Sequence, residues 1–175
     1  MRFTGAWLAA LALAMLIEPA AACDMAAGDD GKSPLRTRKP ILGEEVRFTA
    51  GFGMQLHPLL QQPRLHTGVD WAAPMGTQVI AAGAGRVVEA GPRGEYGNAL
   101  IIEHGNGWQT FYSQLSRFDV KEGDCVAFGA PIGEVGSTGL SSGPHLHYEV
   151  RRDGKPIDPM LVALKSAPPE AGDNK

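Results

Sequence analysis

The chain has 175 residues, of which 43% are hydrophobic, so it is long enough to bury one core and fits a single globular domain. Its 23 glycines and 13 prolines disfavour long helices and suit short strands joined by turns, which predicts an all-β, mostly antiparallel class. The formal net charge of −3 argues against a phosphate backbone as a partner, so we expect no nucleic-acid binding.

Residues 1–22 have the features of a secretory signal peptide. Arg2 supplies a short basic region, an apolar stretch runs from Trp7 to Ile17, and residues 20–22 offer a small-residue cleavage site. Glu18 and Pro19 end the apolar stretch well short of the roughly 20 residues that a membrane-spanning helix needs. We therefore expect an exported protein in the periplasm or outside the cell.

The two cysteines, Cys23 and Cys125, are too far apart in sequence for a C-x-x-C metal or redox motif. Cys23 directly follows the expected cleavage site, where a bacterial lipoprotein carries its acylated cysteine, so a membrane tether through Cys23 is one interpretation. The alternatives are a disulfide between Cys23 and Cys125 in an oxidising compartment, or a buried Cys125 that only fills space. Residues 23–40 lack apolar periodicity and predict a solvated linker.

Residues 41–165 are expected to form the folded domain, a compact two-layer β structure rich in glycine. Six short β-rich segments alternate with glycines there: 78–82, 85–90, 99–104, 108–115, 131–136 and 145–151. Residues 100–102 are continuously apolar, as in a strand covered on both faces. After Asp158 and Pro159, residues 160–165 predict one short helix, and residues 166–175 predict a disordered tail.

His66 and Asp70 form the first arrangement that a metal would require. The three residues between them, Thr67, Gly68 and Val69, are poor helix formers, so a shared helical face is not expected. In a straight strand the two residues would share a face but stand about 13 Å apart at ~3.3 Å per residue, too far to bind one ion comfortably. We therefore predict a bend between them, which Gly68 allows.

Residues 145–150 read His-Leu-His-Tyr-Glu-Val, whose later residues predict a strand. Residues two apart in a strand face the same way, so both imidazoles are expected to point into one site. Zinc takes imidazole nitrogen and carboxylate oxygen, and a catalytic zinc typically has three protein ligands and one open position. Two histidines and one aspartate meet that count. Each motif is weak alone, but their co-occurrence in a glycine-rich exported β domain is a stronger indication.

Several stretches together resemble the lysostaphin-type zinc endopeptidases: residues 51–53, His57-Pro58, and the segments 66–71 and 136–149. The resemblance covers about Arg47 to Pro159. It implies a compact antiparallel β fold with a groove, one zinc ion as cofactor, and hydrolysis of peptide bonds in peptidoglycan cross-links or bridges. By position it implies that His66, Asp70 and His147 are metal ligands. His145 corresponds to the catalytic histidine of this family, acting in proton transfer.

The sequence departs from this family at one position. The family usually has a second active-site histidine in a Y-x-H-L motif, whereas residues 112–115 here read Tyr-Ser-Gln-Leu. Gln114 can donate an amide hydrogen bond to a developing oxyanion, but it cannot carry positive charge or exchange a proton near neutral pH. We therefore include Gln114 as a catalytic candidate. The presence of glutamine where the family has histidine puts activity, but not metal binding, in question.

Two functions follow from these residues. The first is an active zinc endopeptidase whose substrates are peptidoglycan peptides. The second is a zinc-bound, weakly active or inactive domain that binds the wall or modulates another cell-wall hydrolase. The presence of all three ligand residues together with His145 favours the first. Two other polar residues are expected to lie outside the site itself. His104 is expected to flank a turn. Strand alternation puts Glu149 on the same face as His145 and His147, where it either supports the ligands or has a structural role.

Overall fold

The computed structural model describes residues 23, 33–56, 59–162 and 164. In this part of the chain the regular structure consists of β-strands and two short 3-10 turns, η1 (Gly94–Tyr96) and η2 (Pro159–Leu161), which confirms the expected all-β class. The helix expected at 160–165 is wrong: among the described residues of this range only η2 forms, and Val162 after it is already extended. None of the described helical turns is long and apolar enough to span a membrane. The predicted signal peptide and tail lie outside the described residues.

The largest sheet has eight strands, and all of its pairings are antiparallel. Its order across the sheet is β1 (Arg47–Ala50), β4 (Val69–Ala72), β12 (His145–Arg152), β8 (Trp108–Ser113), β7 (Asn98–Glu103), β6 (Gly85–Pro92) and β10 (Cys125–Val126), and β13 (Lys155–Ile157) pairs with one end of β12. Four of the predicted β-rich segments fall in this sheet, and each forms a strand: 85–90, 99–104, 108–115 and 145–151.

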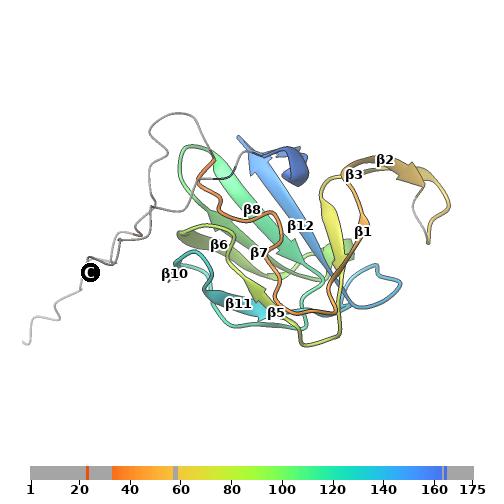
Figure 1. Cartoon of the computed structure of the whole chain (residues 1–175), viewed down its shortest axis with the longest axis horizontal. Helices are drawn as coiled ribbons and strands as arrows, with labels where there is room; N and C mark the ends of the chain where they lie inside the picture. Colours follow the sequence, from red (N-terminus) through yellow and green to blue (C-terminus); the bar gives the residue numbers. More distant parts are fainter. Residues whose placement is uncertain (1–22, 24–32, 57–58, 163, 165–175) are drawn as a thin grey trace, which may run out of the picture.

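Two smaller sheets complete the fold. One has the order β5 (Gln78–Ile80), β11 (Pro131–Glu134) and β9 (Arg117–Phe118), and the other is the hairpin of β2 (Gly53–Leu56) and β3 (Pro63–His66). The β2–β3 hairpin extends from one side of the body (Figure 1). The other two predicted segments therefore become β5 and β11, whereas the hairpin was not expected from the sequence.

Side chains alternate between the two faces of the large sheet. We call the face that packs on the main core the core face, and the opposite face, which carries His145 and His147, the groove face. Leu146, Tyr148 and Val150 of β12 are buried in the main core. This core also includes Val79 and Ile132 of the three-stranded sheet. A second, smaller cluster on the opposite face contains Ala99, Ile101 and Phe111. This confirms the prediction that residues 100–102 form a strand covered on both faces.

Residues 33–40 pack against the small sheet instead of forming the expected solvated linker. Ser33 and Leu35 are buried, and the amide of Arg36 donates to the carbonyl of Ala82. The amide of Ile80 in turn donates to the carbonyl of Pro40. The segment thus pairs with the open edge of β5, which would otherwise expose unpaired backbone groups. Because irregular backbone pairing leaves no apolar periodicity, the sequence pattern did not reveal it.

Cys23 and Cys125 form a disulfide that joins the N-terminal side of the chain to β10 across 102 residues of sequence. The pairing selects one of the interpretations left open by the sequence. Because a sulfur in a disulfide cannot also carry a thioether-linked lipid, the bond and acylation of Cys23 exclude each other in one molecule.

Candidate metal centre and groove

The bend predicted between His66 and Asp70 is present. β3 ends at His66, β4 begins at Val69, and the two residues between them turn the chain. This bend lies so close to β12 that a Cβ added to Gly68 would stand 2.3 Å from the carbonyl oxygen of Tyr148. Glycine is therefore required by close backbone approach. The bend brings Nε2 of His66 to 3.1 Å from Oδ1 of Asp70.

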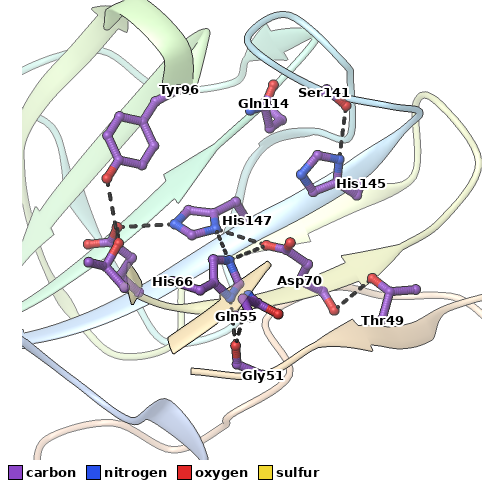
Figure 2. Close-up of polar contacts among 12 residues, drawn as sticks. Thr49, Gly51, Gln55, His66, Asp70, Tyr96, Gln114, Ser141, His145 and His147 are labelled. Carbon is purple, nitrogen blue, oxygen red and sulfur yellow. Dashed lines mark hydrogen bonds and ion pairs between the residues drawn. The ribbon is translucent and has the colours of Figure 1, made fainter. Parts of the chain in front are cut away.

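His147 joins these two residues from the neighbouring strand. In the ladder of β12 with β4, His147 stands directly opposite Asp70. Its Nδ1 lies 2.8 Å from Oδ1 of Asp70 and 3.1 Å from Nε2 of His66. The three donor atoms all lie within 4.8 Å of one another. Figure 2 shows the three side chains converging on one point.

The outer hydrogen bonds of both imidazoles fix which nitrogen can bind a metal. Nδ1 of His66 lies 2.6 Å from the carbonyl oxygen of Gly51, and a carbonyl can only accept, so Nδ1 carries the proton and Nε2 keeps its lone pair. In His147, Nε2 lies 3.1 Å from the Glu149 carboxylate, which leaves the lone pair on Nδ1. Metal-binding histidines are oriented in this way. Two nitrogens and one carboxylate oxygen form a donor set that suits zinc.

Glu149 belongs to the centre, although the sequence interpretation left it outside. Its side chain is fully buried and also accepts hydrogen bonds from Thr67, at 2.6 Å, and Arg151, at 2.7 Å. Its spacing, two residues after His147, predicted the shared face, and the contact with His147 selects the supporting role over a purely structural one. Its carboxylate contacts Nε2 of His147, on the side of the ring opposite the Nδ1 that faces His66 and Asp70.

The electrostatics of the centre favour negative carboxyl groups around a cation. Burial alone favours a neutral His147, but its hydrogen bonds to Asp70 and Glu149 outweigh burial and raise its pKa to about 9. Burial likewise opposes charge on both carboxyl groups, yet their hydrogen bonds hold the pKa of Asp70 and of Glu149 below the usual range. A divalent metal that takes the Nδ1 lone pair would replace the proton of His147.

His145 lies two residues before His147 and lines the same groove, as the strand alternation predicted. Its Nδ1 lies 2.9 Å from the carbonyl oxygen of Gly143 and 3.1 Å from the hydroxyl of Ser141. The carbonyl requires a proton on Nδ1, so in the neutral ring the lone pair is on Nε2, on the side of the ring turned away from Ser141 (Figure 2). The contribution of Ser141 was not foreseen from the sequence.

Gln114 also lines the groove, directly after the end of β8. Its side-chain oxygen accepts from the amide of Gly139 at 2.7 Å, and its side-chain nitrogen donates to the carbonyl of Glu95 at 3.3 Å. The amide group therefore joins the η1 turn to the loop that leads to β12. Its backbone φ is 67°, in the left-handed region.

The groove over these residues has a volume of about 370 Å³. Its walls come from separate parts of the chain: the β2–β3 hairpin, the η1 turn and the loop around residues 140–142. Leu56, Leu59, Leu65 and Leu140 give it apolar patches beside the polar centre. An open groove of this kind suits an extended peptide. Together with the donor set and the imidazole of His145, it has the features of a single-metal hydrolase site.

Comparison with known proteins identifies the class. The model of peptidase family M23 matches residues 64–159, more than half of the chain, so the chain belongs to this family. The match confirms the resemblance to lysostaphin-type peptidases. The catalytic domain of lysostaphin from Staphylococcus simulans superposes with a TM-score of 0.59 at 34% identity, covering 65% of this chain and 89% of that one.

Two further relatives extend the comparison. A zinc-containing peptidase from Vibrio cholerae superposes with a TM-score of 0.69 at 34% identity, over 77% of this chain and 41% of that one. The DD-carboxypeptidase/endopeptidase Mpg of Neisseria meningitidis serogroup B is 52% identical over 119 residues, which are 68% of this chain and 27% of that protein. These similarities support a zinc metallopeptidase. The chain spans between about a quarter and about a third of the length of the curated relatives it matches, from 26% to 35%.

Proposed function

We propose that this protein is a zinc metalloendopeptidase that hydrolyses DD peptide bonds in peptidoglycan cross-links, with His66, Asp70 and His147 holding one zinc ion. The observation that carries the proposal is the convergence of three correctly oriented donors beside the imidazole of His145 in one groove. The names of its relatives, among them Mpg and the peptidoglycan DD-endopeptidase ShyA, support a DD bond in peptidoglycan as the target.

The reaction requires activation of a water molecule and of the peptide carbonyl. A bound zinc ion supplies Lewis-acid polarisation of both. Nε2 of His145 accepts the proton of the attacking water and later delivers it to the leaving nitrogen. The hydrogen bond of Nδ1 to the Gly143 carbonyl keeps this tautomer and fixes the ring. His145 is therefore the group that moves the proton.

Gln114 is proposed to support the oxyanion as a neutral donor. Its side-chain nitrogen carries two hydrogens, and the Glu95 carbonyl takes one of them. The second hydrogen is available for an oxygen in the groove. The contact with the Gly139 amide fixes which end of the group is the nitrogen. A neutral amide makes weaker hydrogen bonds to an anion than a cationic imidazole does, so we expect slow turnover.

Peptidoglycan lies in the cell envelope, and we propose that the protein is exported there by residues 1–22, as a periplasmic or extracellular domain without a lipid on Cys23. The disulfide to Cys125 supports this, because such bonds persist in oxidising compartments. Intact-mass analysis of the exported protein should give a chain that begins at Cys23 and lacks two hydrogens. A diacylglyceryl mass on Cys23, or retention of Met1 on exported protein, would contradict the assignment.

The decisive experiment is incubation of the purified, zinc-loaded protein with defined cross-linked muropeptides, followed by mass spectrometry of the products. We expect the dimers to be cut at the D-alanine carbonyl of the cross-link. His145→Ala should abolish cleavage and keep its zinc. If wild-type protein binds zinc and muropeptides but releases no product, the alternative function as a wall-binding or regulatory domain is correct.

A further inference from the structure

Arg64 places a positive charge in the groove close to the metal centre. It lies on β3 two residues before His66, so both side chains are on the same face of the strand, with Cα atoms about 6.6 Å apart at ~3.3 Å per residue. Among the described residues that line the groove, Arg64 is the only arginine or lysine. Its side chain is 48% exposed, so a ligand can reach it.

The guanidinium is held in place but not saturated. Nη2 of Arg64 donates to Oε2 of Glu95 on the η1 turn at 2.7 Å, which joins two segments that line the groove. This is the only hydrogen bond that the Arg64 side chain makes with the described part of the chain. The Glu95 side chain is 57% exposed, and an exposed pair of this kind contributes little to folding. A guanidinium has five N–H donors, so four are not used by the described residues and can serve a second carboxylate.

The chemistry of a DD bond places a carboxylate at a fixed point. In such a bond the scissile nitrogen belongs to an amino acid centre of D configuration, and the carbon attached to that nitrogen carries a carboxyl group. This holds for a terminal D-alanine and for the D centre of meso-diaminopimelate in a cross-link. The carboxylate therefore stands only three bonds from the carbonyl carbon that must approach the metal centre. A cross-link to a lysine side chain lacks this group.

We propose that Arg64 is the residue that recognises this carboxylate and so makes the site specific for DD bonds. The inference rests on the proposed function and deepens it. Arg64 binds the carboxylate through the N–H groups that Glu95 leaves open, and Glu95 keeps the guanidinium turned into the groove. A planar guanidinium suits this task because it can hold both carboxylate oxygens at once.

The test uses two matched cross-linked dimers, one with the free carboxylate next to the scissile nitrogen and one with a carboxamide there. Wild-type protein should cleave the carboxylate dimer with a kcat/KM higher by on the order of tenfold to a hundredfold, the value of a charged hydrogen bond. Arg64→Gln should lose this preference, mainly through a higher KM for the carboxylate dimer. Glu95→Gln should keep most of the preference.

Two controls separate recognition from folding and from catalysis. Arg86→Gln removes the same charge from β6, outside the residues that line the groove, and should leave the preference unchanged. Zinc content should be equal in all of these variants. Calorimetry on His145→Ala, with and without Arg64→Gln, measures binding of a stem pentapeptide that ends in D-Ala-D-Ala and of its terminal carboxamide. Only the form with Arg64 should prefer the free carboxylate.

The outcomes distinguish this inference from the proposed function. If wild type cleaves both dimers equally, or if Arg64→Gln slows both by the same factor, Arg64 does not recognise the carboxylate. If no dimer is cleaved, the endopeptidase function fails. The calorimetry then decides about Arg64 alone, and equal binding of the two pentapeptides with and without Arg64 overturns its role.

Discussion

The two faces of the large sheet each bury a histidine, and the two histidines have opposite charge preferences. On the core face, His104 is 1% exposed, and its nitrogens contact the Ala84 carbonyl at 2.8 Å and the Thr110 hydroxyl at 2.7 Å. On the groove face, His147 is 6% exposed and contacts two carboxylates. Burial lowers the pKa of His104 to about 4, whereas the carboxylates raise the pKa of His147 to about 9.

The difference shows that burial does not determine what a histidine does; its partners determine it. Both nitrogens of His104 are taken by neutral groups of the fold, so this residue stabilises the core as an uncharged imidazole. His147 has one nitrogen fixed by Glu149, and the other faces His66 and Asp70. The same side chain is therefore structural on one face and a candidate metal ligand on the other.

Replacing each histidine by glutamine should give the largest contrast. His147→Gln removes a nitrogen donor, so we expect loss of stoichiometric zinc and of all zinc-dependent cleavage. His104→Gln should keep one zinc per chain, because His104 is not among the candidate ligands. Elemental analysis of the purified variants measures both. Zinc retained at full occupancy in His147→Gln, or lost in His104→Gln, would break the comparison.

The pH dependence of stability should separate the two faces next. The unfolded chain protonates His104 near the ordinary histidine pKa of 6.5 and the folded chain only near about 4, so the unfolded state binds more protons between these values. The stability that a neutral His104 contributes is thus fully present above the unfolded-state pKa of 6.5. It is lost as the pH falls through the folded-state pKa of about 4. Its full size is about 3 kcal/mol.

Urea unfolding in excess chelator measures this effect, with wild type compared with His104→Gln at each pH. The difference in the free energy of unfolding between the two proteins should shrink as the pH falls from about 7 to about 4. Chelator keeps the metal state equal, so titration of the groove face cancels in the difference. A difference that does not change with pH would mean that His104 is not held neutral.

A histidine in place of Gln114 tests whether a cationic donor in the groove speeds catalysis. Gln114→His should raise cleavage by on the order of a hundredfold at unchanged zinc content, because a cationic donor stabilises an oxyanion better than a neutral amide does. The left-handed backbone, with φ of 67°, accepts histidine more readily than most residues. Gln114→Ala is the control, which removes the contacts to Glu95 and Gly139 without adding charge. Equal rates for wild type and Gln114→His would contradict the argument.

The smallest effect concerns the carboxylate behind His147. Glu149→Gln should weaken zinc affinity by roughly tenfold to a hundredfold, because the carboxylate orients the ring and strengthens its basicity. Arg151→Gln is the matched control: it removes the ion pair of Glu149 but keeps the contact with His147. Competition with a zinc chelator measures both affinities. An equal loss of zinc affinity in the two variants would mean that the buried ion pair between Arg151 and Glu149 matters, and not the contact of Glu149 with the His147 ring.

The sequence by itself determined the features that depend on neighbours along the chain. Glycine and proline content predicted short strands, and the alternation in 145–150 predicted that His145 and His147 share a face. The four-residue spacing of His66 and Asp70 required a bend, which Gly68 permits. These arguments succeed because strand geometry fixes where residues two or four apart can lie.

Only the tertiary structure decided which distant groups meet. Cys23 pairs with Cys125 across 102 residues, Arg64 reaches Glu95, and the amide of Gln114 joins two loops. The packing of residues 33–40 on β5 was likewise not expected, and only the structure decided that Glu149 contacts His147. Such contacts depend on the order of strands in the sheets, and that order is set by burying one shared core, not by the composition of any single segment.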